Sequence, residues 1–138
     1  QPMRVVLDTN VLVSGVLSAA GPPGWIIEAV LTGRLEFGVD TRIRAEYEDV
    51  LRRPEFAFSP ERIADLLEAI DRFAFQVAAV EPWPAPLPDR DDEPWLAVAG
   101  ATGSVLVTGN LKHFPARARR GVLVQAPREF IEYLRNEA

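Results

Sequence analysis

Residues 5–15 read VVLDTNVLVSG, an apolar run that is interrupted by an aspartate, a threonine and an asparagine. Branched aliphatic residues crowd both sides of Asp8, as they do around a strand that is buried on both of its faces. Burying a carboxylate at the end of such a strand is unfavourable unless hydrogen bonds or a cation compensate its charge. The stretch therefore predicts a central strand that ends at Asp8, where the carboxylate has a partner.

The composition limits the class of protein. The chain has 138 residues, a formal net charge of −5, no cysteine and one histidine. Residues 3–138 are expected to form a single domain, with Gln1 and Pro2 as remnants ahead of Met3. The lack of cysteine excludes disulfides, thiolate zinc sites and cysteine nucleophiles. Neither a leader nor an apolar run of the roughly 20 residues needed to cross a membrane is seen, so a cytoplasmic protein without membrane contact is expected.

Apolar segments of strand length alternate with segments of helical periodicity along the chain. Strands are predicted at residues 3–7, 35–39, 76–80, 104–107 and 122–125. Helices are predicted at residues 10–19, 25–31, 41–53, 60–73, 92–101 and 127–134, and the proline-rich segment 81–88 is expected to be extended. The alternation predicts an α/β fold, a three-layer α/β/α sandwich with a mostly parallel central sheet. In such sheets the functional crevice lies beyond the carboxyl ends of the strands.

Three acidic residues fall where this crevice is expected. Asp8 ends the first strand, Glu46 flanks the apolar stripe of the third helix, and Asp92 lies in register with the stripe of the fifth. Each also has an ordinary explanation. Asp8 and Asp92 are suited to cap helices, and Glu46 is suited to pair with Arg42 or Arg53 at the edge of its helix.

A fourth polar position follows the strand at residues 104–107. Thr108, Gly109 and Asn110 come directly after it, in the same order of strand and polar turn as at Asp8. A turn with a capping asparagine explains this segment without chemistry. Asn110 is also a candidate for holding a water or a metal through its carbonyl oxygen.

Several carboxylates in one crevice repel one another, and this raises the pKa of at least one of them unless a cation lies among them. Oxygen ligands, without cysteine and with a single histidine, favour Mg²⁺ or Mn²⁺ over zinc. Asp8, Glu46 and Asp92 are therefore the predicted metal ligands. Because magnesium also binds substrate phosphate oxygens, the site suggests hydrolysis of a phosphodiester or a phosphomonoester.

Four segments in this order resemble those of PIN domains: VVLDTNVLVSG, AEYEDVL, DRDDEPWLAVAGATG and VLVTGNLKHF. More narrowly, they resemble the VapC-like ribonucleases that are toxins of bacterial toxin–antitoxin systems. The resemblance covers nearly the whole chain and assigns Asp8, Glu46 and Asp92 to the family's acidic positions. It assigns Asn110 to a fourth catalytic position that is often an aspartate. An amide is neutral and binds a cation less strongly, so Asp91 is a candidate to supply the missing charge.

The resemblance implies a metal-dependent endoribonuclease that leaves a 5′-phosphate and a 3′-hydroxyl. It further implies Mg²⁺ or Mn²⁺ as cofactor, RNA as substrate, an antitoxin as partner and a symmetric homodimer. Thr9 and Thr108 are expected to bond the ligands or the phosphate, Asn10 to orient Asp8, and Asp91 to support the site.

A basic cluster lies just beyond Asn110, and its members are Lys112, Arg117, Arg119 and Arg120. We expect this cluster to contact the nucleic-acid backbone, with an ordinary solvated loop as the alternative. His113 is expected to be a surface residue, with a phosphate contact as the alternative.

Other functions are open at this point. A phosphatase with an aspartate nucleophile after its first strand needs a second aspartate two places on, where this chain has Asn10. A metal-free ribonuclease that uses two histidines is excluded, because His113 is the only histidine. The stronger alternative is a non-catalytic RNA- or protein-binding module with a weakened metal site, and its evidence is Asn110 together with the acidic net charge.

Overall fold

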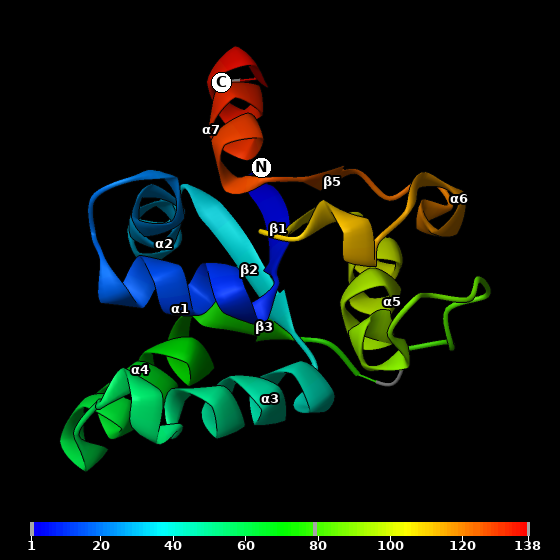
Figure 1. Ribbon diagram of the computed structural model, residues 1–138. Helices are drawn as coiled ribbons and strands as arrows, with labels where there is room; N and C mark the ends of the chain where they lie inside the picture. The colour runs from blue at the N-terminus through cyan, green and yellow to red at the C-terminus, as the bar shows by residue number, and fades with distance from the viewer. Residues whose placement is uncertain (1, 79, 138) are drawn as a thin grey trace.

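A five-stranded sheet forms the centre of the computed structural model, which describes residues 2–78 and 80–137 (Figure 1). The strands are β1 (Met3–Leu7), β2 (Leu35–Val39), β3 (Ala74–Gln76), β4 (Val105–Val107) and β5 (Val124–Gln125). Their order across the sheet is β3-β2-β1-β4-β5, and each pairing of neighbours is parallel. The predicted parallel sheet is confirmed.

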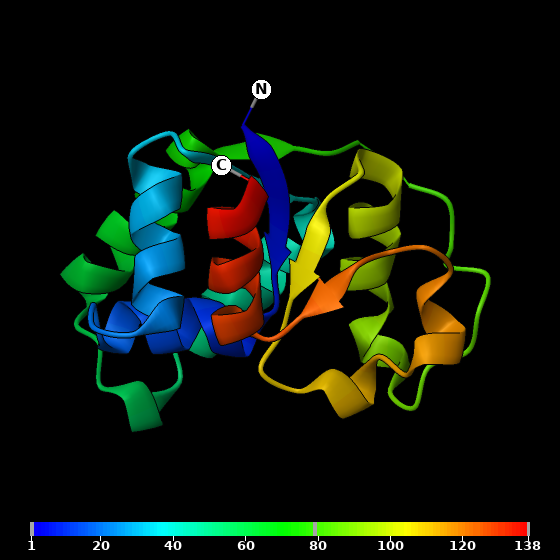
Figure 2. The ribbon, with the colours of Figure 1, turned by 90° about the horizontal axis from the view of Figure 1, so that it is seen from above.

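Helices cover both faces of this sheet, so the predicted three-layer α/β/α sandwich is confirmed. Helices α1 and α2 lie on one side of the sheet, and α5 and α6 lie on the other (Figures 1 and 2). The α-helices are α1 (Thr9–Leu17), α2 (Pro22–Leu31), α3 (Thr41–Leu51), α4 (Pro60–Phe73), α5 (Glu93–Thr102), α6 (Ala116–Arg119) and α7 (Pro127–Glu137). Short 3₁₀ helices occur at η1 (Pro54–Phe56), η2 (Arg90–Asp92) and η3 (Leu111–His113).

Some boundaries differ from those predicted. Strand β3 occupies residues 74–76 instead of 76–80, because it pairs with the last residues of β2, where Val39 is opposite Gln76. Residue 79 of the predicted strand lies outside the described residues. Helix α2 begins at Pro22 instead of Trp25. Prolines are tolerated in the first turn of a helix, because the N–H groups there have no partner within the helix. Helix α6 was not predicted, because four residues show no helical period.

The remaining elements begin or end within three residues of their predicted bounds. The proline-rich segment 81–88 forms neither helix nor strand, as predicted. Among the described residues, no single helix is long and apolar enough to cross a membrane. Helices α1 and α2 meet that requirement only when they are taken together, across a bend of 92°.

The strand order creates a switch point between β1 and β4. The chain adds β2 and β3 on one side of β1 and then returns to add β4 and β5 on the other side. Leu7 pairs with Val107, so Asp8 and Thr108 emerge side by side at the carboxyl edge of the sheet. Ligand sites of parallel sheets lie at such points.

The carbonyl oxygen of Leu7 anchors two helices to the end of β1. The Tyr47 hydroxyl of α3 donates to it, and so does Nε1 of Trp95 in α5, at 3.0 Å. Both aromatic side chains are fully buried. The two anchors bring α3 and α5 to the residue just before Asp8, and the segments that contain Glu46 and Asp92 come with them.

Candidate active site

Asp8 lies at the switch point and is 8 % exposed. Its Oδ1 accepts a hydrogen bond from the backbone N–H of Thr9 at 2.8 Å, and its Oδ2 accepts one from the Thr108 hydroxyl at 2.7 Å. Burial raises the pKa of Asp8, and these two hydrogen bonds partly oppose the shift. Asp8 is thus the N-terminal cap of α1, as the ordinary explanation predicted, and it is also tied to the neighbouring strand.

Glu46 faces the same region from α3. Its Oε2 accepts a hydrogen bond from the Thr9 hydroxyl. Burial raises the pKa of Glu46, and the negative charge of Asp8 raises it further. Neither predicted arginine partner forms an ion pair with it: Arg42 pairs with Asp40 and Glu93, and Arg53 pairs with Asp49.

Asp92 ends η2 immediately before α5, and its side chain is 15 % exposed. It stands at the N-terminal position of α5, but its side chain makes no capping hydrogen bond, so capping does not explain it. Burial together with the charge of Asp8 raises the pKa of Asp92 to about 6, while His113 opposes the shift. Its buried Oδ2 has no hydrogen-bond partner among the described residues.

One pocket collects these three carboxylates. It has a volume of about 430 Å³, and Asp8, Glu46, Asp92 and His113 line it. Val13, Leu17, Val50 and Phe56 form an apolar wall of the same pocket. The predicted convergence of the three acids on one crevice is therefore seen, at the edge of the sheet where it was expected.

Asn110 lies at the start of η3, and its side chain contacts His113. The amide Nδ2 of Asn110 is 2.9 Å from Nε2 of the histidine. Its backbone N–H donates to the Thr108 hydroxyl at 3.0 Å, which links this turn to Asp8. The Asn110 side chain makes no capping hydrogen bond.

His113 is the residue that the sequence underrated. Its side chain is 43 % exposed, but its Nδ1 lies 3.0 Å from Oδ2 of Asp92, and the residue lines the pocket. A spacing of three residues from Asn110, one turn of a 3₁₀ helix, was the available signal. The sequence did not predict that helix, so the two side chains were not expected to meet.

The supporting residues divide into two groups. Thr9 and Thr108 both bond carboxylates, as predicted. Asn10 lines the pocket, but its Oδ1 accepts from the Gly109 N–H at 3.3 Å instead of contacting Asp8. Asp91 is exposed and lines an adjoining pocket with Glu46, whose pKa it raises.

The predicted basic cluster begins in η3 and continues past α6, and its members do not line the carboxylate pocket. Lys112 is in η3, Arg117 and Arg119 are in α6, and Arg120 follows it. Nε of Arg119 donates to the Phe114 carbonyl at 2.7 Å, so one of its donors is already used in a hydrogen bond within the protein. The arginine that lines the pocket is Arg53.

The donor set fits a hard divalent cation. Burial raises the pKa of all three carboxylates, the charge of Asp8 adds to the shift of Glu46 and Asp92, and one buried oxygen lacks a hydrogen bond. Within residues 2–78 and 80–137, however, no three acidic or histidine side chains are already arranged as ligands of one ion. At least one side chain would have to change rotamer, and Glu46, which is long and only partly buried, is best placed to do so. The metal assignment stays a prediction.

Comparisons with known proteins agree with this fold. The model of a family described as PIN domain matches residues 4–112. Among solved structures, VapBC-1 from nontypeable Haemophilus influenzae is similar with a TM-score of 0.61 and 16 % identity, over 91 % of this chain and 99 % of the other. FitAcB from Neisseria gonorrhoeae is similar with a TM-score of 0.56 and 16 % identity, over 89 % and 97 %. No curated protein matches the sequence.

Proposed function

The chain belongs to the PIN domain family, and on that premise we propose that it is a metal-dependent endoribonuclease, the toxin of a toxin–antitoxin pair. The observation that carries the proposal is the meeting of Asp8, Glu46 and Asp92 in one pocket at the switch point of the sheet. Nuclease activity is general in this family. The carboxylates come from three separate elements, and among the described residues none of the three forms an ion pair with an arginine or a lysine.

Asp8, Glu46 and Asp92 would hold Mg²⁺ or Mn²⁺. When bound there, the ion would polarise the scissile phosphate and lower the pKa of water. The protein's part is to fix the carboxylates: Thr108 and the Thr9 backbone donate to the two oxygens of Asp8. The Thr9 hydroxyl holds Glu46 beside it. The bonds to Asp8 orient that carboxylate in advance, which reduces the reorganisation that binding requires. Glu46 would exchange its bond with the Thr9 hydroxyl for the ion by a change of rotamer.

RNA binding would rest on the cations around the pocket. Arg53 lines it, and Lys112 lies in the turn that begins at Asn110. The rest of the predicted basic cluster, on and after α6, would extend the contact with the phosphate backbone. This local arrangement would offset the repulsion that the net charge of −5 exerts on nucleic acid.

An antitoxin is the proposed protein partner. The structurally similar VapBC-1 and FitAcB are toxin–antitoxin proteins, which supports such a partner for this chain. The pocket combines acidic groups with an apolar wall. A segment that carries basic and apolar side chains would fit both parts and cover the carboxylates. We also propose that the chain forms a symmetric homodimer.

Cleavage of labelled RNA tests the proposed activity. Protein freed of any antitoxin should cleave single-stranded RNA with Mg²⁺ or Mn²⁺ and not with a chelator. Asp8→Asn should reduce the cleavage rate by more than about 100-fold, because it changes a metal ligand itself, and changing a residue that only supports a ligand usually costs about 10- to 100-fold in activity. Glu48→Gln, on the opposite face of α3, is the matched control and should retain the activity of the wild type.

A wild-type protein that cleaves no RNA with either metal would overturn the nuclease proposal. Retained binding of RNA in that case would establish the alternative, a non-catalytic binding module.

A further inference from the structure

The buried Oδ2 of Asp92 needs a group that compensates its charge, and neither Asp8 nor Glu46 can be that group, since both are carboxylates. Oδ2 is buried and forms no hydrogen bond among the described residues, and Nδ1 of His113 lies 3.0 Å away. A buried anionic oxygen is costly unless a donor or a cation lies next to it. His113 is the group in that place.

The orientation of the histidine ring is set from its other side. Nδ2 of Asn110 lies 2.9 Å from Nε2, and an amide nitrogen can only donate, so Nε2 is the acceptor. In a neutral ring the proton is then on Nδ1, the nitrogen that faces Asp92. Asn110 thus selects the form of the ring that carries its proton on Nδ1, the atom in contact with the carboxylate, although this N–H is not aligned with Oδ2 for a hydrogen bond.

The backbone holds this arrangement together. The N–H of Asn110 donates to the Thr108 hydroxyl, which itself donates to Asp8. The N–H of His113 donates to the Asn110 carbonyl at 3.1 Å, which closes the turn that brings the two side chains together. The same short turn therefore reaches Asp8 through Thr108 and Asp92 through His113.

We propose that His113 is a positioning residue of the metal site, which holds the Asp92 carboxylate in place, and that Asn110 acts on the site through His113 instead of as a metal ligand. This inference rests on the proposed function, since it concerns the same pocket. It accounts for an asparagine at a position where the family often has an aspartate: its amide supplies the donor that Nε2 requires.

Direct measurement of Mn²⁺ binding, by the paramagnetic resonance signal of the free ion, tests the proposal separately from catalysis. His113→Ala should raise the dissociation constant by about 10- to 100-fold, the usual cost of losing a partner of a metal ligand. His113→Asn places an amide near the position of Nδ1 and should recover part of the affinity. Leu111→Ala, an exposed residue of the same turn, is the matched control and should bind as the wild type does.

A double-mutant cycle separates the two roles. Asn110→Ala should weaken Mn²⁺ binding in the wild type and have no further effect in the His113→Ala background, because it acts through the ring. Equal weakening in both backgrounds would show that Asn110 acts directly, and wild-type affinity in His113→Ala would show that the histidine has no positioning role. Either result overturns the proposal, and melting temperatures of all variants verify that they are folded.

Cleavage of RNA by the same proteins distinguishes the two proposals. Wild-type protein that binds Mn²⁺ with the predicted dependence on His113 but cleaves no RNA overturns the nuclease function alone. Protein that cleaves RNA while His113→Ala binds Mn²⁺ normally overturns the positioning role alone. Wild-type protein that binds no Mn²⁺ overturns both.

Discussion

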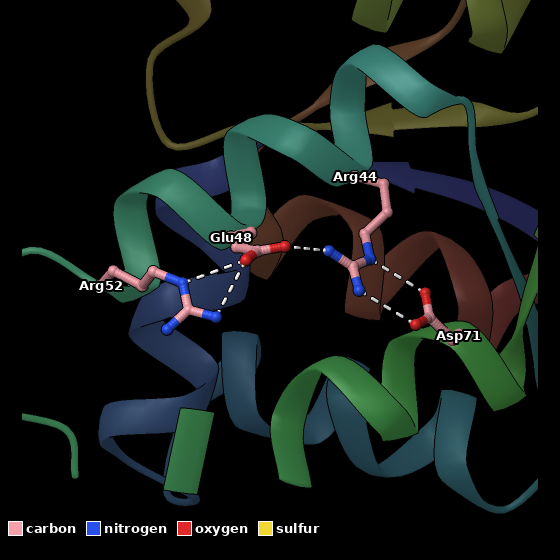
Figure 3. A network of polar contacts seen from close by, with 4 residues as sticks. All are labelled: Arg44, Glu48, Arg52 and Asp71. Atoms are coloured by element: carbon pink, nitrogen blue, oxygen red, sulfur yellow. Dashed lines mark hydrogen bonds and ion pairs between the residues drawn. The ribbon is translucent and has the colours of Figure 1, made fainter. Parts of the chain in front are cut away.

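Helix α3 carries two glutamates, Glu46 and Glu48, whose surroundings differ completely. Glu48 accepts hydrogen bonds from Arg44 and Arg52, and Arg44 also holds Asp71 through two bonds of 2.9 and 3.0 Å (Figure 3). These arginine hydrogen bonds lower the pKa of Glu48 and of Asp71. Glu46 has no ion-pair partner among the described residues, and its pKa is raised.

The two regions differ in how the negative charges of their carboxylates are compensated. On the surface network each carboxylate has an arginine beside it. In the pocket, the one histidine contact belongs to Asp92. Burial raises the pKa of all three carboxylates, and the charge of Asp8 raises those of Glu46 and Asp92 further. In the surface network, arginines of the chain neutralise the carboxylates. In the pocket, the carboxylate charges have to be neutralised by bound protons or by a cation from solution.

The largest effect on stability is expected when the Trp95 anchor beside the pocket is lost. Trp95→Ala removes a side chain that is 2 % exposed, together with its bond to the Leu7 carbonyl, and should lower the free energy of unfolding by about 3–5 kcal/mol. Urea denaturation measures it. Trp25→Ala, at a tryptophan that is 41 % exposed, should cost much less. Equal losses in the two variants would contradict the anchoring role.

Addition of metal should stabilise the pocket and leave the surface network unaffected. Mn²⁺ at 100 times its dissociation constant should raise the free energy of unfolding of the wild type by about 2.7 kcal/mol. Asp8→Asn should lose most of this gain and Glu48→Gln should retain it, and melting curves with and without Mn²⁺ measure both. A gain that Asp8→Asn keeps in full would place the ion elsewhere.

The two regions should respond to pH in opposite directions in protein treated with a chelator. The pKa of Asp92 is raised in the folded state, from an ordinary 3.8 to about 6, so the folded protein retains a proton that the unfolded chain has lost. Stability should therefore fall as the pH rises from about 4 to about 6. Asp92→Asn should flatten this decline in urea midpoints measured across the range.

Below that range the surface network should dominate. The folded-state pKa values of Glu48 and Asp71 are lowered, so their contribution is present above their ordinary values of 4.5 and 3.8 and is lost as the pH falls further. Stability that rises steadily from pH 4 to pH 6 would contradict the account of the pocket.

The smallest effect is expected from neutralising each glutamate of α3 without metal. Glu46→Gln removes a charge that Asp8 repels, keeps an oxygen for the Thr9 hydroxyl, and should leave the protein unchanged or slightly more stable at pH 7. Glu48→Gln removes the partner of two arginines and should lower stability slightly. Midpoints of urea denaturation at one pH compare them. If Glu46→Gln were less stable than Glu48→Gln, the different surroundings of the two glutamates would not determine their contributions to stability.

The sequence allowed the sheet and the three acids to be predicted, because their signals are local. Apolar runs followed by Asp8 and Thr108 marked the ends of two strands, and helical period placed Glu46 at the edge of its stripe. Strand order was not predicted, since no local pattern says that β1 and β4 are neighbours. The grouping of the acids followed from the rule that the crevice lies beyond the carboxyl ends of parallel strands, and the family resemblance assigned the same three residues.

The contact of His113 with Asp92 could not be predicted from the sequence. It depends on a single 3₁₀ turn at residues 111–113 and on the path of α5, which bring together two residues far apart in the chain. The start of α2 was missed for a different reason: two prolines that usually interrupt a helix are favourable in its first turn.

A crystal structure of the protein soaked in Mn²⁺ would show, through the anomalous signal of the ion, whether the three carboxylates of the pocket hold it. We expect a peak within about 2.0–2.6 Å of carboxylate oxygens from Asp8, Glu46 and Asp92, with Glu46 turned from its present rotamer. A peak held by other residues, or an empty pocket at saturating Mn²⁺, would contradict it.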